Sequence, residues 1–136
     1  MAGTSGAVAS LPHEAEELVA AVDDDRLGLV VDTAHAFAAG VPIDGPEGVA
    51  SFRQDLRGRG LAARLALVHA NDSVFERGAR RDRHTDIRDG TIGESGWRAM
   101  ATDPVLSSVP WILETPGGPE RQRDDIAYVR SLSEGR

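Results

Sequence analysis

The sequence contains no cysteine and no lysine among its 136 residues. The absence of cysteine excludes disulfides, thiolate nucleophiles and thiolate zinc sites, so only His, Asp and Glu could ligate a metal ion. No apolar run approaches the roughly 18 residues that a membrane-spanning helix needs. Met1–Gly6 also lacks the basic start and apolar core of a secretory signal, and we therefore expect a cytoplasmic protein without membrane contact.

Acidic residues outnumber basic ones. Twenty-two Asp and Glu against 15 Arg give a net charge of −7, which argues against a protein that holds nucleic acid by broad electrostatic attraction. Hydrophobic residues make up 40% and charged residues 27% of the chain, as in globular domains. The length is sufficient for one domain with a hydrophobic core.

Predicted helices and strands alternate along the chain. Ser10 is the expected N-cap of the first helix, and Asp44 is the expected N-cap of a helix that starts at Pro46. The apolar run Leu27–Val31 shows no alternation, which is typical of a strand covered on both faces, and Arg64–Val68 is predicted to be a second buried strand. Residues 71–93 are polar and are expected to form a long loop. The expected helices cover Leu11–Asp24, Pro46 to Gly58 or Gly60, Glu94–Thr102 and a segment from Gly117 onward, and the strands cover Leu27–Val31, Arg64–Val68 and Val109–Leu113.

Each predicted strand is followed by a potential metal ligand. These ligands are Asp32, His69 and Glu114. Repeated strand–helix units imply a parallel sheet with flanking helices, and such sheets carry their chemistry at the C-terminal strand ends. One such residue alone is more often a cap or turn residue. Three of them at one edge favour a functional site.

Three further residues extend this set. His35 follows Asp32 by three residues, and Asp82 and His84 share one side of an extended segment. The remaining histidine, His13, is predicted to be an ordinary surface residue of the first helix. Mixed imidazole and carboxylate ligation suits zinc or manganese, and six ligands indicate more than one ion, as in two-metal phosphodiester hydrolysis. The candidate ligands are Asp32, His35, His69, Asp82, His84 and Glu114.

Five separated segments resemble motifs of endonuclease IV (deoxyribonuclease IV), a zinc-dependent apurinic/apyrimidinic endonuclease. They occur in the family's order and at similar spacing. The resemblance implies a partial (β/α)8 TIM barrel of the xylose-isomerase-like superfamily, with residues 1–136 forming its C-terminal half as three parallel strands with flanking helices. The segments are Val31–Gly40, His69–Ser73, Asp82–His84, Gly90–Gly93 and Ile112–Thr115.

The resemblance also implies an activity. The family uses three zinc ions to cut double-stranded DNA on the 5′ side of an abasic site, in base excision repair. Glu114 would be catalytic, holding a metal and orienting the attacking hydroxide, and five arginines between residues 77 and 88 would contact phosphates locally. The implied ligand sets are His35, Asp82 and His84 for one zinc, and Asp32, His69 and Glu114 for a second.

Departures from the family concern mainly its first half. Three ligands of the family site, which come from that half, have no counterpart here. We therefore expect a truncated or split enzyme that is inactive alone, or active only with a complementary barrel half or by self-association. Smaller departures are Ala34, Ala70 and Arg88, the last at a position where the family usually has glycine near the DNA, so that Arg88 could disturb its loop.

Two alternatives stay open at this stage. The first is a sugar isomerase or epimerase of the same barrel superfamily, which also places Glu, Asp and His around divalent metals. Asp82 and His84, with the long loop before them, favour the nuclease because isomerases lack this feature. The second alternative is a non-catalytic fragment or a metal-stabilised interaction module.

Overall fold

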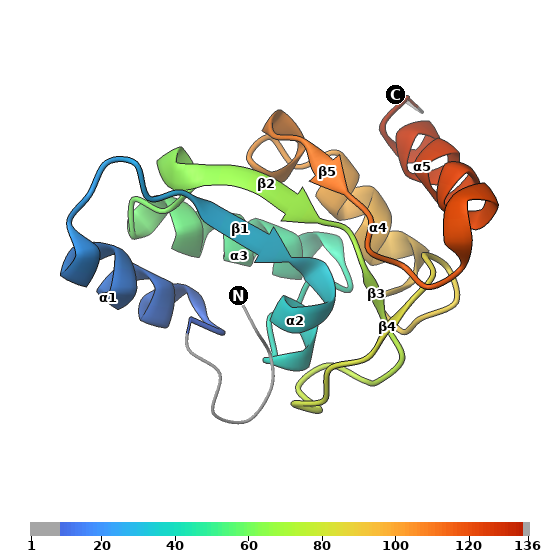
Figure 1. Cartoon of the computed structure of the whole chain (residues 1–136), viewed down its shortest axis with the longest axis horizontal. Helices are drawn as coiled ribbons and strands as arrows, with labels where there is room; N and C mark the ends of the chain where they lie inside the picture. The colour runs from blue at the N-terminus through green and yellow to red at the C-terminus, as the bar shows by residue number, and fades with distance from the viewer. Residues whose placement is uncertain (1–8, 135–136) are drawn as a thin grey trace.

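A computed structural model of the chain describes residues 9–134, so the Met1–Gly6 segment considered above lies outside the described residues. The expected helices and strands occur in the expected order, with one additional helix and a two-stranded hairpin between them (Figure 1). No helix in the described part is both long and apolar enough to cross a membrane. The elements are α1 (Pro12–Val22), β1 (Leu29–Asp32), α2 (Thr33–Ala38), α3 (Pro46–Gly58), β2 (Leu65–His69), β3 (Asp72–Ser73), β4 (His84–Thr85), α4 (Gly93–Ala101), β5 (Trp111–Ile112) and α5 (Gly118–Glu134), with short 3-10 turns at Ala62–Arg64 and Leu106–Ser108.

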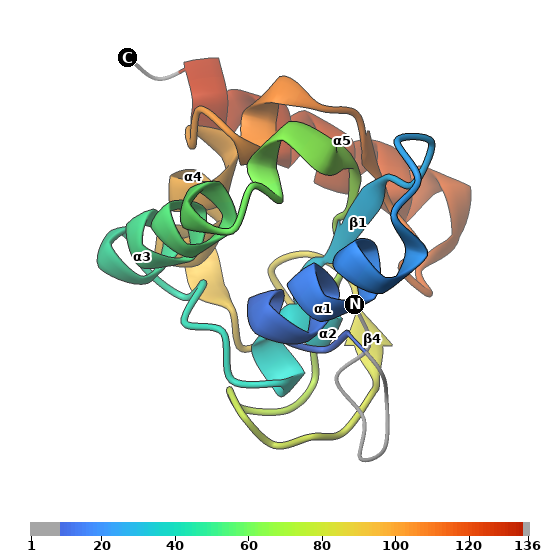
Figure 2. The same cartoon turned by 90° about the vertical axis from the view of Figure 1, so that its left-hand side faces the viewer.

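Three parallel strands form the main sheet, in the order β1-β2-β5. This arrangement confirms the predicted partial barrel of parallel strands with flanking helices. α3 and α4 lie behind the sheet in Figure 1, and Figure 2 shows the same two helices to one side of β1. The expected helices Pro46–Gly58 and Glu94–Thr102 are therefore present within about one residue of their predicted bounds.

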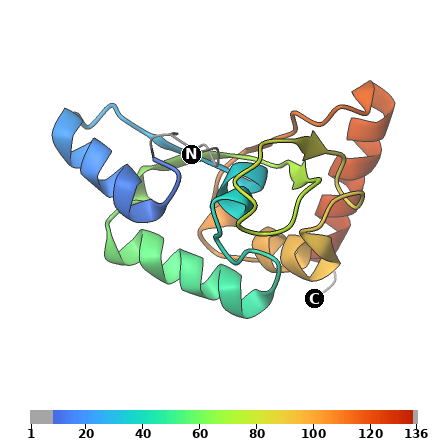
Figure 3. The ribbon, with the colours of Figure 1, turned by 90° about the horizontal axis from the view of Figure 1, so that it is seen from below.

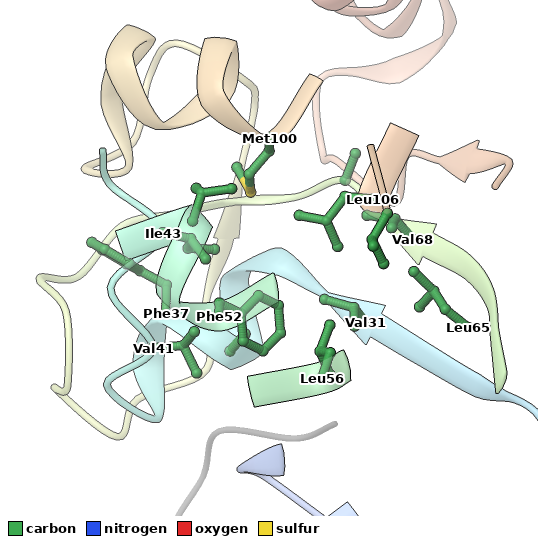
Figure 4. Close-up of a cluster of buried hydrophobic side chains, with 14 of the residues drawn as sticks. Val31, Phe37, Val41, Ile43, Phe52, Leu56, Leu65, Val68, Met100 and Leu106 are labelled. Atoms are coloured by element: carbon green, nitrogen blue, oxygen red, sulfur yellow. The ribbon is translucent and has the colours of Figure 1, made fainter. Parts of the chain in front are cut away.

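The hydrophobic core lies between the sheet and these helices. Val31 of β1 and Val68 of β2 are almost fully buried, and Figure 4 shows Val31 beside Leu56 of α3 and Val68 beside Leu106. Trp97 and Met100 of α4 are also fully buried. The buried positions of α3 and α4 recur at three- or four-residue spacing, which is why the helical pattern was readable from the sequence.

The opposite face of the sheet has no helix over it in the described chain, as Figures 1 and 3 show. Ala66 and Ile112 are exposed there, and Val30 is half-buried. The expectation of a strand covered on both faces is therefore wrong at Val30, and the second strand, expected to be buried, exposes Ala66. In a closed barrel this face would point into the interior, where side chains from the other strands would cover it.

Both predicted N-caps are wrong. α1 has Leu11 as its N-cap, and the backbone N–H groups of Ser10 and Leu11 donate to the carboxylate of Glu14 at 2.7 and 3.0 Å. Gly45 is the N-cap of α3, while the carboxylate of Asp44 accepts a hydrogen bond from Arg77 at 2.9 Å.

The segment 71–93, expected to be a loop, contains the antiparallel hairpin of β3 and β4, with Ser73 paired to His84. α2 was not predicted either. It is six residues long and begins directly after β1. The third strand is shorter than expected, because only Trp111 and Ile112 pair with β2. As a result, His35 lies on a helix, α2, and His84 lies on a strand, β4.

Candidate metal centre

Asp32 occupies the centre of the site. It is the last residue of β1 and the N-cap of α2, and its Oδ1 accepts the backbone N–H of His35 at 3.0 Å. This cap turns the chain so that His35 lies one turn from Asp32. The carboxylate is almost completely buried, and the other oxygen, Oδ2, remains available to neighbouring groups.

The first group of candidate ligands joins the three strand ends. Asp32 of β1 is in register with His69 of β2, so the two side chains leave the same edge of the sheet. His69 Nδ1 lies 3.7 Å from Asp32 Oδ2 and 3.1 Å from Glu114 Oε2. One ligand atom from each residue falls within 4.8 Å of the other two, which is compact enough to surround a metal ion.

A second group of candidate ligands consists of His35 of α2 with Asp82 and His84 of the hairpin. His35 Nε2 and His84 Nε2 lie 3.3 Å apart, and Asp82 Oδ1 lies 3.0 and 3.6 Å from these two nitrogens. Asp32 Oδ2 also lies 3.7 Å from His35 Nδ1 and 3.8 Å from His84 Nε2. The structure therefore brings all six predicted residues together, and Asp32 faces both groups. His13, by contrast, is exposed on α1, as expected.

The loop between β3 and β4 is attached to α2. The backbone N–H of Gly78 donates to Phe37 O at 2.9 Å, and that of Arg80 donates to Ala38 O at 3.0 Å. The loop lies beside α2 in Figures 1 and 3. Because these bonds satisfy carbonyls near the end of α2, they hold the hairpin against the helix that carries His35. This attachment explains how residues far apart in sequence meet.

The donor set fits a divalent zinc ion. Each group combines imidazole nitrogen with carboxylate oxygen, the mixture that zinc accepts in proteins without cysteine. Asp32 is buried, whereas the side chains of Asp82 and Glu114 are 42% and 48% exposed. The centre therefore has a closed inner side and an outer side that an ion and a substrate can reach.

Two buried residues of the His69–Ser73 segment have roles that sequence reasoning did not assign. Asn71 contacts both Asp32 and Glu114. The carboxylate of Asp72 accepts four N–H groups, from Ser73, Arg88, Ile92 and the indole of Trp97. Burial raises the pKa of the Asp72 carboxyl above its usual value, and these hydrogen bonds oppose that rise. The only sequence signal for either residue was its position just after a strand that ends in a candidate ligand.

Several arginines of the hairpin loop lie at the surface. Arg81 stacks over the ring of Phe75, with its guanidinium carbon 3.8 Å from the ring centroid, and Arg80 and Arg83 are exposed. Arg88 differs from them, since its side chain reaches Asp125 of α5 at 3.2 Å. Its backbone has φ = +82°, a conformation that favours glycine.

Comparisons with known proteins agree with this architecture. The family model described as a xylose isomerase-like TIM barrel matches residues 1–132. A protein named probable endonuclease 4 from Streptomyces coelicolor is 43% identical over 113 residues, which cover 81% of this chain and 37% of the relative. A protein of the same name from a Sulfurihydrogenibium species is 34% identical over 132 residues, covering 97% of this chain and 47% of the relative.

A solved structure shows the same arrangement in three dimensions. The crystal structure of endonuclease IV from Thermus thermophilus superposes with a TM-score of 0.83 at 34% identity, covering 99% of this chain and 48% of that one. The chain thus spans less than half the length of these relatives. It belongs to the xylose isomerase-like TIM barrel family, and the predicted resemblance to endonuclease IV is confirmed.

Proposed function

We propose that this chain carries part of the active site of a zinc-dependent apurinic/apyrimidinic endonuclease, which hydrolyses the phosphodiester on the 5′ side of an abasic site in double-stranded DNA. The observation that carries the proposal is the convergence of three imidazoles, those of His35, His69 and His84, on Asp32 Oδ2. The carboxylates of Asp82 and Glu114 lie against these imidazoles on the other side. The second group, built by the hairpin, favours a nuclease over a sugar isomerase, because isomerases lack the Asp82 and His84 segment.

Each residue has a defined part in this proposal. Zinc ions held by the two groups would supply Lewis-acid activation of the scissile phosphate. Glu114 is the residue proposed as catalytic: its carboxylate faces His69 on one side and is half exposed on the other, so it can orient a water molecule at the outer side of the centre. Arg80, Arg81 and Arg83 are exposed on the adjoining loop and can contact DNA phosphates despite the net negative charge of the chain.

Metal binding gives the most direct test. We expect the purified chain to bind zinc, and substitutions His35→Ala and His69→Ala each to weaken binding by at least about tenfold, because each removes a nitrogen ligand from one group. Calorimetric titration of the metal-free protein measures this. The matched control is His13→Ala, which removes an exposed histidine outside the centre. Equal zinc affinity in all four proteins would refute the proposal.

We further propose that the remainder of a barrel, supplied by a second polypeptide segment, completes the site. β1 and β5 each pair only with β2 among residues 9–134, which leaves two strand edges open. Beside β5, a groove of about 580 Å³ is lined partly by Trp111, Leu113 and Ile126. In a closed barrel every strand has two neighbours, so these edges and this apolar surface fit further strands and helices of the same fold.

Complementation tests this requirement. An abasic-site duplex in zinc buffer is incubated with the chain alone, and with the chain plus the first half of the Streptomyces coelicolor relative. We expect cleavage on the 5′ side only when both are present, and no cleavage of a duplex without an abasic site. Cleavage by the chain alone would refute the need for a second segment. Activity that appears with rising concentration of the chain alone would instead identify self-association.

A further inference from the structure

Asn71 links the strand ends that carry the candidate ligands. It follows β2 by two residues and has no exposed surface. Its Nδ2 donates to Asp32 Oδ2 at 3.0 Å and to Glu114 Oε2 at 3.3 Å, while its Oδ1 accepts the backbone N–H of Glu114 at 2.9 Å. One amide group therefore contacts a residue at the end of β1 and another just beyond β5.

The orientation of this amide is fixed by its partners. The backbone N–H of Glu114 is a donor only, so the atom facing it must be the Asn71 oxygen, and the NH₂ group then faces both carboxylates. The backbone of Asn71 is held separately. Its N–H donates to Thr33 Oγ1 at 2.9 Å, and the Thr33 hydroxyl donates to Asn71 O at 2.6 Å.

The two carboxylate oxygens that Asn71 holds are the oxygens that face His69 Nδ1. Two ionised carboxylates so close to each other repel, and a shared donor offsets that repulsion. Each carboxylate oxygen has lone pairs for both a hydrogen bond and a metal ion. The constraint matters most for Glu114, because its side chain is half exposed and would otherwise sample many rotamers in water.

We propose that Asn71 is a positioning residue that holds Asp32 and Glu114 in place for a divalent cation at the Asp32, His69 and Glu114 group. The inference rests on the proposed function in assuming that this group binds a metal. Asn71 itself contacts neither ion nor DNA in this role. It acts through the two carboxylates, and it reduces the ordering that the group must undergo when the ion binds.

The test compares Asn71→Ala with the wild type. Both proteins are titrated with Co²⁺ or Zn²⁺. The two bound ions are told apart by the variants that weaken them: His69→Ala weakens one, here called the His69-dependent ion, and His35→Ala weakens the other, the His35-dependent ion. We expect Asn71→Ala to weaken binding of the His69-dependent ion by about 10–100-fold. Binding of the His35-dependent ion should weaken by a clearly smaller factor, because the two groups share Asp32 but only the first contains Glu114. Thr91→Val is the control variant, because it removes hydrogen bonds to Ser73 O and Phe75 O of the same hairpin without touching a carboxylate.

A second measurement needs no metal. Hydrogen exchange of the Glu114 backbone amide in the metal-free protein should accelerate at least about tenfold in Asn71→Ala, while amides of α3 keep their rates. If Asn71→Ala does not fold, Asn71→Ser replaces it, because serine keeps a polar group in the buried site but is too short to hold both carboxylates. Both variants keep the Thr33 bonds, which involve only the backbone of residue 71. Unchanged cation affinity at the His69-dependent site with faster exchange, or unchanged exchange at Glu114, would overturn the inference. A wild type that binds no cation would instead refute the proposed function on which it rests.

Discussion

Asp72 is a buried carboxylate that organises the loop behind the candidate metal centre. Its Oδ1 accepts the N–H groups of Ser73 and Ile92 at 2.9 and 3.1 Å, and its Oδ2 accepts the Trp97 indole at 2.8 Å. A Cβ added at Gly90 would approach Asp72 Oδ1 to 2.2 Å, so the chain can pass this carboxylate only as glycine. These hydrogen bonds to Asp72 keep β3 close to the start of α4.

Replacing this carboxylate by an amide should be costly. Asn has one oxygen in place of two, so Asp72→Asn leaves N–H donors facing an NH₂ group in a buried site. We expect the free energy of unfolding to fall by about 2–5 kcal/mol, measured by urea denaturation. Asp124→Asn, on the exposed side of α5, should change it by less than about 0.5 kcal/mol. If the two variants lowered the free energy of unfolding equally, the hydrogen bonds to Asp72 would not have this stabilising role.

The difference in the free energy of unfolding between wild type and Asp72→Asn should also depend on pH. Because burial raises the pKa of Asp72, the folded chain keeps this proton at pH values where the unfolded chain has lost it. The contribution to stability is thus fully present below the unfolded-state pKa and is lost as the pH rises through the folded-state pKa. The stability difference between wild type and Asp72→Asn should shrink as the pH rises through this window. A difference that grows with pH would show that the pKa is lowered instead.

At the scale of elements, Arg88 connects the loop before α4 to α5. Its guanidinium lies 3.2 Å from Asp125 Oδ1, and its central carbon lies 4.8 Å from the centroid of the Tyr128 ring. Asp125 is fully buried and also accepts the backbone N–H of Ile87 at 3.2 Å. Arg88, one of the departures from the family noted in the sequence, is thus tied to the last helix.

The backbone of Arg88 gives a clean comparison of two variants. Arg88→Gly and Arg88→Ala remove the same contacts to α5, but only glycine adopts φ = +82° without a steric penalty. We expect Arg88→Gly to be more stable than Arg88→Ala by about 1–2 kcal/mol in thermal or chemical unfolding. At Asp89, which has no positive φ, alanine should be at least as stable as glycine. If the glycine variant were more stable than the alanine variant at both positions, the positive φ of Arg88 would not explain the difference.

Periodic elements were predictable from the sequence, whereas short ones were not. α3 and α4 each bury residues at helical spacing, so their bounds could be read directly. α2 has six residues and the strands of the hairpin have two each, which is too short for any period to show. The hairpin forms because tertiary contacts with α2 fix it, and a single sequence does not display such contacts.

The candidate site was predictable to a similar degree. Strand ends identified Asp32, His69 and Glu114 because a parallel sheet brings its C-terminal ends to one edge. The role of Asn71 was not predicted, because nothing in the neighbouring sequence indicates that an amide would span the distance from β1 to the residues after β5. Its role depends on the register of the sheet, which the sequence pattern does not define.

For the whole molecule, a metal ion held by several elements should stabilise the fold. The ligands come from β1, α2, β2, the hairpin and the segment after β5. An ion that binds only the folded chain, at a free concentration of one hundred times its dissociation constant, adds about 2.7 kcal/mol. For a domain of this size we expect the Tm to rise by roughly 10 °C in zinc and to return on adding EDTA. The rise should be smaller in His69→Ala and undiminished in His13→Ala. A Tm that zinc leaves unchanged would contradict a centre that spans these elements.

The register that places Asp32 beside His69 also has a kinetic consequence. Parallel pairing joins segments that are distant along the chain, so each contact must close a long loop before it contributes energy. Asp32, His69 and Glu114 can therefore gather only after both crossover connections have formed. A nascent chain that ends before β5 lacks Glu114 and the pairing that positions it, so metal capture at the Asp32, His69 and Glu114 group reports a late stage of folding, after capture at His35 and His84 has become possible.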